Sequence, residues 1–148
     1  MLRTFTFSLT LILFAGANFA AADQNASDIG VKLFGYDLCQ GKQFCGIVYV
    51  APWCPTCKQM MPTYRQYLLH DGRQPNHGFQ VVVGAGKTAR GNNLMAQNYG
   101  EGAMADNNGR IQRRLGINLY PSYLVFDSDR NVILRGNPAR KWITQNFR

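Results

Sequence analysis

The chain has 148 residues, of which 46% are hydrophobic, and it carries 16 Lys and Arg against 8 Asp and Glu, for a formal net charge of +8. This length is that of one domain with a single core, and it excludes an assembly of several domains. The positive charge fits a solvated basic surface, and a count of basic residues does not by itself indicate a partner.

The N-terminal residues have the pattern of a secretory signal peptide. Arg3 supplies a positive charge, Phe5–Phe14 is mostly apolar, and Ala20–Ala22 offers small residues for cleavage. We therefore expect residues 1–22 to be removed on export and residues 23–148 to form one domain. No cysteine lies at the cleavage point, so a lipoprotein anchor is not indicated.

The signal peptide predicts the compartment. We expect the mature chain to be soluble in the periplasm or another extracytoplasmic compartment, because no later segment approaches the roughly 20 apolar residues of a membrane span. An exported protein seldom meets nucleic acid, so no nucleic-acid partner is predicted. An oxidising compartment also lets disulfides persist.

The first two of the four cysteines flank a short polar turn. Cys39 and Cys45 are separated by five residues, and we predict that they form an auxiliary disulfide. The alternative is a zinc site that gathers all four cysteines, with His70 or His77 in reserve. Zinc knuckles usually place both cysteine pairs on turns, which disfavours this alternative, and no metal is predicted.

The second pair of cysteines stands where a buried strand gives way to a helix. Gly46–Ala51 is apolar and β-branched enough for a strand that is buried on both faces. Cys54 then lies at the N-terminus of a helix predicted from Cys57 to about Leu69 and kinked at Pro62. Free backbone N–H groups at a helix start favour a thiolate, and Cys57 is one turn away, so the pair suits disulfide exchange.

Strands and helices alternate along the rest of the chain. Residues 84–110 are rich in Gly and Asn and predict a long connection that contains a helix at Asn93–Tyr99. The other predicted elements are the strands Val31–Phe34, Phe79–Val83, Tyr123–Phe126 and Val132–Leu134, a helical turn at Ile111–Leu115 and a last helix from Pro138 to Phe147.

One segment after a strand superficially suggests a phosphate-binding loop. Gly84–Thr88 contains Gly-Lys-Thr, but the motif needs a glycine five residues before Gly86, and Val81 stands there. Nucleotide binding is therefore not expected, and no cofactor is predicted.

Two blocks of sequence together resemble the thioredoxin-like superfamily, in particular its exported Dsb-like and TlpA-like thiol-disulfide oxidoreductases. The resemblance covers about residues 30–148. The residues that carry it are Trp53, the Cys54-Pro55-Thr56-Cys57 motif, Lys58 and Pro62, followed by Arg114-Leu115-Gly116-Ile117 and Tyr120-Pro121-Ser122.

The resemblance implies an α/β thioredoxin-like fold, with a central mixed β-sheet flanked by helices and an insertion after the third strand. It implies that Cys54 is the nucleophile and Cys57 the resolving thiol. A cis bond before Pro121 would place the backbone of Tyr120 beside the sulfurs, where it can bind an extended substrate. Trp53 would shape the surface around the pair.

One departure from the family bears on mechanism. Val48 stands six residues before Cys54, where thioredoxin and several oxidising relatives have a buried carboxylate. Proton transfer to Cys57 would then use water or Lys58.

We therefore expect an exported thiol-disulfide oxidoreductase whose direction is unassigned. Its expected partners are protein substrates with cysteines and, for electron exchange, a membrane redox protein. The alternatives are a thioredoxin-like protein that binds Cu(I) or Zn(II) through its thiolates, and a non-catalytic adaptor in an envelope assembly.

Overall fold

The computed structural model describes residues 42–71 and 73–148. The predicted signal peptide, the predicted strand Val31–Phe34 and Cys39 lie outside these residues.

A mixed sheet of five strands forms the centre of the described region, in the order β3-β2-β1-β4-β5. β1 pairs in parallel with β2, and β2 in parallel with β3, while β4 is antiparallel to both β1 and β5. This is the expected mixed α/β architecture. The strands are β1 (Phe44–Val50), β2 (His77–Val83), β3 (Ala103–Ala105), β4 (Ser122–Asp127) and β5 (Val132–Arg135).

The central strand is buried along almost its whole length. Every residue of β1 after Phe44 is buried, because helices cover both faces of the sheet and strands flank both of its edges. A strand in such a place needs a continuous apolar run, which Ile47-Val48-Tyr49-Val50 supplies. β1 and β2 each begin two residues before the predicted strands, because Phe44 pairs with His77 at the start of the ladder.

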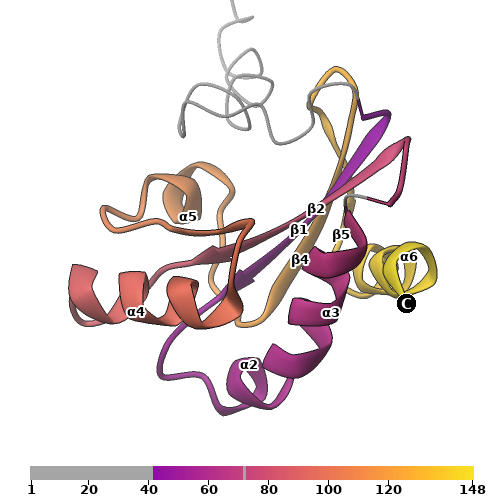
Figure 1. Cartoon of the computed structure of the whole chain (residues 1–148). Helices are drawn as coiled ribbons and strands as arrows, with labels where there is room; N and C mark the ends of the chain where they lie inside the picture. The colour runs from indigo at the N-terminus through magenta and orange to yellow at the C-terminus, as the bar shows by residue number, and fades with distance from the viewer. Residues whose placement is uncertain (1–41, 72) are drawn as a thin grey trace, which may run out of the picture.

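Helices lie on both sides of the sheet (Figure 1). α3, α4 and α6 pack on one face, against Val48, Val50 and Val81, and α5 covers the other, against Ile47 and Tyr49. The two parallel crossovers, from β1 to β2 and from β2 to β3, advance in the same direction along the sheet, so their helices share a face. The helices are α2 (Pro55–Gln59), α3 (Met61–Asp71), α4 (Ala89–Tyr99), α5 (Arg110–Arg114) and α6 (Asn137–Phe147).

The helix predicted from Cys57 to Leu69 is two helices. α2 ends at Gln59, and Met60 forms the junction with α3. The break therefore comes before Pro62 and not at it. Pro62 lies in the first turn of α3, where backbone N–H groups have no partner within the helix, so its missing N–H costs little.

The segment after β2 contains more structure than its composition predicts. α4 begins four residues before the expected helix, because the Thr88 hydroxyl caps it by accepting a 3.1 Å hydrogen bond from the N–H of Gly91. β3 was not predicted. It has three residues and adds to the edge of the sheet beside Val81, Val82 and Val83.

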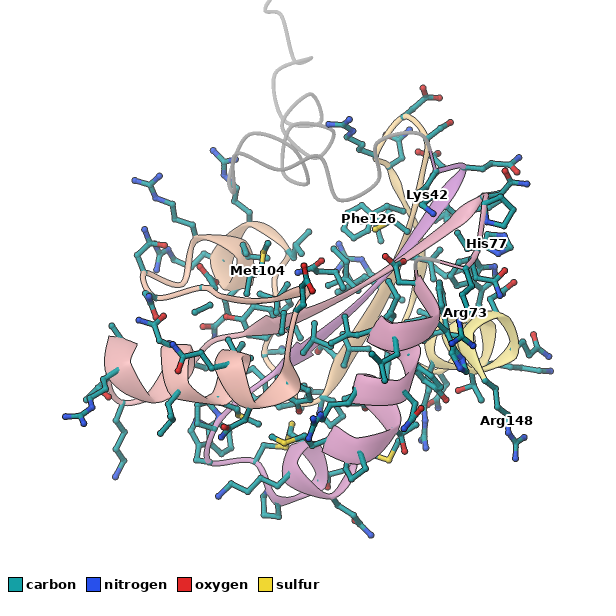
Figure 2. All side chains as sticks on the ribbon, in the orientation of Figure 1. Lys42, Arg73, His77, Met104, Phe126 and Arg148 are labelled. Atoms are coloured by element: carbon teal, nitrogen blue, oxygen red, sulfur yellow. A yellow bond between two sulfur atoms is a disulfide. The ribbon has the colours of Figure 1, made fainter. Side chains whose placement is uncertain are left out.

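The buried apolar side chains form two clusters, one on each face of the sheet. Aromatic side chains dominate the cluster below α3, α4 and α6, where Tyr64, Tyr99 and Phe147 are fully buried. Met104 and Phe126, labelled in Figure 2, belong to the cluster on the α5 side. In the described part of the chain, every helix is too short or too polar to cross a membrane.

Candidate redox site

Cys54 and Cys57 form a disulfide at the junction of β1 and α2. Cys54 is the N-cap of α2, with the extended backbone angles φ −79° and ψ 115°, and Pro55 opens the helix. The backbone N–H of Cys57 donates a 3.1 Å hydrogen bond to Cys54 Sγ. A donor in this place stabilises negative charge on Cys54 when the disulfide opens.

The two sulfurs differ in access. Cys57 is fully buried, whereas Cys54 is 4% exposed, and Trp53 beside it is 54% exposed. An incoming thiolate therefore meets Cys54 first. This asymmetry suits Cys54 for attack and Cys57 for the leaving thiolate.

Tyr120 reaches the disulfide from a distant part of the sequence. Its carbonyl oxygen lies 3.6 Å from Cys54 Sγ, across 66 positions of the chain. The peptide bond between Tyr120 and Pro121 is cis. In the dithiol form the Cys54 thiol can donate to this carbonyl, whereas the disulfide sulfur has no proton to donate.

Trp53 lies over the same residue. Its indole ring meets the ring of Tyr120 edge to face, with centroids 5.2 Å apart. Its Nε1–H donates a 2.7 Å hydrogen bond to the carbonyl oxygen of Ala85. The structure thus brings together the five residues predicted to be catalytic or substrate-binding, which are Trp53, Cys54, Cys57, Tyr120 and Pro121.

A polar cluster behind Tyr120 was not predicted. The hydroxyl of Tyr120 accepts a 2.6 Å hydrogen bond from Gln112 Nε2. Asp106 Oδ2 accepts from the Tyr49 hydroxyl and from the Gln112 N–H, both at 3.0 Å. Asp106 follows a strand of only three residues, which is too short to show a periodic pattern, and it belongs to no motif. Sequence reasoning therefore did not identify it.

The tyrosines of this cluster are neutral. Burial, together with the charge of Asp106, raises the pKa of Tyr49 well above its ordinary value of 10.0. Burial also raises the pKa of Tyr120. Tyr49 therefore keeps the proton that it donates to Asp106.

The surroundings of Cys57 are apolar. Val48, which stands where thioredoxin has a buried carboxylate, is fully buried in the same cluster as Cys57. Among the described residues, the buried polar side chains are Gln80, Asn92 and Asp106, and Asp106 bonds to Tyr49 on the other face of the sheet. The Tyr99 hydroxyl donates a 3.1 Å hydrogen bond to the carbonyl oxygen of Cys57, not to its sulfur.

The auxiliary disulfide stays a prediction, and the zinc site stays the alternative to it. Cys45 is buried in β1, and its predicted partner Cys39 lies outside the described residues. Within residues 42–71 and 73–148, no three His, Cys, Asp or Glu side chains are grouped as metal ligands. His70 Nδ1 lies 3.1 Å from the carbonyl oxygen of Phe147, and His77 packs against Trp142.

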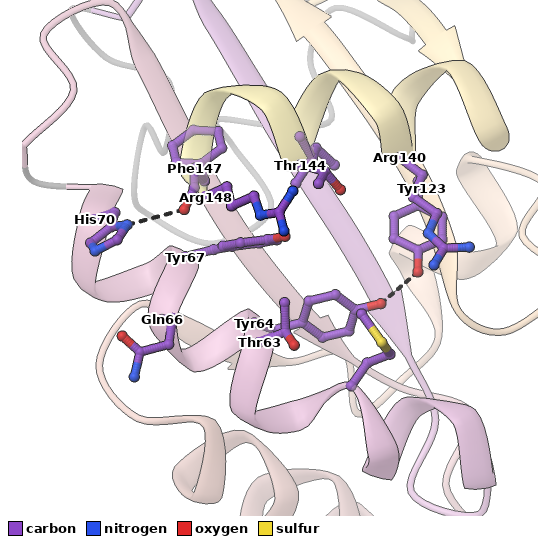
Figure 3. A pocket seen from close by; sticks show the side chains of 12 residues that line it. Thr63, Tyr64, Gln66, Tyr67, His70, Tyr123, Arg140, Thr144, Phe147 and Arg148 are labelled. Carbon is purple, nitrogen blue, oxygen red and sulfur yellow. Dashed lines mark hydrogen bonds between the residues drawn. The ribbon is translucent and has the colours of Figure 1, made fainter.

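Two grooves flank the region of Tyr123. One has a volume of 630 Å³ between α3 and α6, where aromatic rings and Arg140 line it, and it includes neither cysteine (Figure 3). The other has a volume of 380 Å³ and is lined by residues that include Leu119, Pro121 and Gly136. The second groove adjoins the candidate site through Pro121, so it offers room for a bound chain.

The sequence profile of the Redoxin family matches residues 32–146, so the chain belongs to the Redoxin family. The fold and the cysteine pair define it as a thioredoxin-like protein of the thiol-disulfide oxidoreductase type. No curated protein matches the chain significantly.

Solved structures share the fold. DsbF of Mycobacterium tuberculosis is 25% identical, with a TM-score of 0.55 over 72% of this chain and 79% of that one. A thioredoxin described as putative from Neisseria meningitidis is 19% identical, with a TM-score of 0.56 over 71% of each chain. The exposed lipoprotein thioredoxin Etrx1 of Streptococcus pneumoniae is 17% identical, with a TM-score of 0.57 over 74% of this chain and 90% of that one.

Proposed function

We propose that this protein is an exported thiol-disulfide oxidoreductase that exchanges disulfides with extracytoplasmic proteins through Cys54 and Cys57. The observation that carries the proposal is the juxtaposition of three features: a disulfide at a helix start, a backbone donor on Cys54 Sγ, and the Tyr120 carbonyl 3.6 Å from the same sulfur. Membership of the Redoxin family supports it.

The proposed chemistry uses the difference in access between the two sulfurs. A substrate thiolate attacks Cys54 Sγ, the Cys54–Cys57 bond breaks, and Cys57 leaves as a thiolate that takes up a proton. A second substrate thiolate then attacks the substrate sulfur of the mixed disulfide and releases Cys54. The substrate loses two electrons and two protons, and the cysteine pair gains them. The reverse sequence reduces a substrate disulfide.

Tyr120 and Pro121 bind the substrate in this proposal. An extended substrate segment lies along the backbone at Tyr120 and into the groove beside Pro121, in the manner of a strand added to an edge. Trp53 covers the approach to Cys54 with its exposed ring. The proposed site therefore selects for polypeptide next to the reacting cysteine.

The predicted signal peptide, residues 1–22, supports export and a mature domain of residues 23–148 in the periplasm or an equivalent compartment. A membrane redox protein is the proposed partner that restores the cysteine pair after each turnover. An auxiliary disulfide between Cys39 and Cys45 would belong to the same compartment.

The first test is the redox equilibrium of protein purified after export. Samples equilibrated in glutathione buffers are alkylated, and the thiols of each cysteine pair are counted by mass spectrometry, with bound metal measured in parallel. A Cys54–Cys57 midpoint near about −120 mV indicates a disulfide donor, and one near about −270 mV a reductant. A pair that stays oxidised throughout, or that holds stoichiometric metal, overturns the proposal in favour of an adaptor or a metal-binding protein.

A further inference from the structure

We propose that Asp106, Tyr49 and Gln112 are positioning residues that hold Tyr120 in place against Cys54, so that binding of polypeptide substrates depends on the segment inserted after β2. This inference rests on the proposed function. It concerns a cluster, here called the Asp106 cluster, that consists of Tyr49, Asp106, Gln112 and Tyr120.

Asp106 is the fixed point of the cluster. Its side chain is 4% exposed, and a buried carboxylate is costly unless hydrogen bonds satisfy it. Oδ2 accepts two of them, from the Tyr49 hydroxyl and the Gln112 N–H. The backbone N–H of Asp106 donates a 2.7 Å hydrogen bond to the carbonyl oxygen of Val83, which anchors the residue to the end of β2.

Tyr120 is held from three directions. Gln112 Nε2 donates to its hydroxyl at 2.6 Å. The Tyr49 ring packs against it with centroids 6.0 Å apart, and the Trp53 ring meets it edge to face at 5.2 Å. The Asp106 carboxylate accepts from the Tyr49 hydroxyl and from the backbone N–H of Gln112, so one buried group anchors two of the three residues that contact Tyr120.

Holding the Tyr120 side chain also restricts the Tyr120 backbone beside Cys54. The carbonyl of Tyr120 is the group that lies against Cys54 Sγ, and a side chain held on three sides restricts the motion of its own main chain. A substrate segment that bonds to this backbone meets a surface that is already ordered, which lowers the entropy cost of binding. A small disulfide without a polypeptide backbone gains nothing from that order.

The Asp106 cluster also gives the inserted segment a role in the selection of substrates. Asp106 follows β3 within the long connection of residues 84–110, and it bonds to Gln112, which lies two residues beyond that connection in α5. Changes in that connection should therefore alter substrate selection without touching the cysteines.

The test compares two oxidised substrates in single turnovers with fully reduced protein, so that each turnover moves two electrons from the Cys54–Cys57 dithiol to the substrate. One substrate is a disulfide-bonded peptide of about 15 residues, and the other is 5,5′-dithiobis(2-nitrobenzoate), which has no peptide backbone. Gln112→Ala and Tyr49→Phe are the variants. We expect the half-saturating peptide concentration to rise about three- to tenfold, as for the loss of one hydrogen bond, while the rate with the small disulfide stays within about twofold.

Two further variants separate positioning from stability. Tyr64 forms a 2.6 Å hydrogen bond with the hydroxyl of Tyr123 on the other face of the sheet (Figure 3). Tyr64→Phe therefore removes one buried hydroxyl, as Tyr49→Phe does. It should leave the half-saturating peptide concentration and the rate with the small disulfide unchanged. Gln112→Glu keeps the reach of the side chain and accepts a hydrogen bond from the Tyr120 hydroxyl, so it should restore most of the peptide binding.

The outcomes are distinct. If Gln112→Ala and Tyr49→Phe bind the peptide as the wild type does, or lose both substrates equally, the inference is wrong. If the reduced wild type reacts with neither substrate, the proposed function fails before the cluster is tested.

Discussion

The indole N–H of Trp53 and the carbonyl oxygen of Ala85 lie 2.7 Å apart in a hydrogen bond that ties two loops together at the candidate site. One loop leads into the disulfide and the other leaves β2. Ala85 has a φ of 54°, in the left-handed region that a residue with a side chain rarely adopts. The bond from Trp53 thus helps to hold an unfavourable backbone conformation next to the cysteines.

Replacing Trp53 by Phe should loosen this junction. Trp53→Phe keeps an aromatic ring beside Tyr120 but removes the N–H donor, so the free energy of unfolding should fall by about 0.5–1.5 kcal/mol. Urea denaturation followed by circular dichroism measures the change. Leu94→Ala, an exposed side chain on α4, serves as a surface control. Equal stability of wild type and Trp53→Phe would show that the bond contributes nothing.

The two cysteines should behave differently when each is replaced. Cys57→Ser removes the resolving thiol, so incubation with a disulfide substrate should accumulate a covalent adduct at Cys54, visible by mass spectrometry without reductant. Cys54→Ser is the matched control and should give little adduct, because Cys57 is fully buried. An adduct that formed mainly on Cys57 would reverse the proposed roles.

Gly84 should tolerate no side chain. A Cβ at this position would clash with the hydroxyl of Tyr49, which the Asp106 cluster holds in place. We expect Gly84→Ala to destabilise the protein by about 1–3 kcal/mol. Gly91→Ala is the comparison, since position 91 lies in α4 near an exposed threonine hydroxyl, and it should be neutral or stabilising. Comparable midpoints for the two variants in thermal denaturation would contradict the expected packing.

Asp71 should give a pH dependence of stability with a defined sign. Burial raises the pKa of Asp71 above 3.8. The hydrogen bond that its carboxylate accepts from the Phe79 N–H and the charge of Lys42 both act to lower this pKa, but burial has the larger effect. The folded state then binds the proton more tightly than the unfolded state. The free energy of unfolding should therefore fall as pH rises from about 3.8 through the folded pKa.

Asp71→Asn tests this dependence because an amide oxygen can still accept from the Phe79 N–H. Unfolding free energies measured by urea at several pH values should show a flatter profile in this range for the variant. A slope identical to that of the wild type would mean that Asp71 does not contribute.

Local sequence patterns predicted much of the site because the chemistry is partly local. The apolar run before Cys54 predicts the buried strand, and the two-residue spacing to Cys57 predicts a pair at a helix start. The placement of Tyr120 against Cys54 depended on the family resemblance, since no local pattern links residues 66 positions apart.

Other features depend on contacts that no local pattern encodes. β3 is a strand because Val81, Val82 and Val83 lie beside it, and its three residues show no period of their own. Asp106 is a buried acceptor only once β2 and α5 are in place. The break between α2 and α3 was misplaced, because the proline was assumed to act within a helix rather than at the start of one.

The separation of the site's two halves has a consequence for how the protein matures. Cys54 precedes Tyr120 by 66 positions, so a chain that emerges during synthesis carries both thiols of the pair before Tyr120 has been added. Until β4 docks beside β1, those thiols react as in any unfolded polypeptide, with whichever oxidant arrives first. In our proposal, discrimination among substrates is therefore acquired only when β4 pairs with β1 and brings Tyr120 to a dithiol that is already reactive.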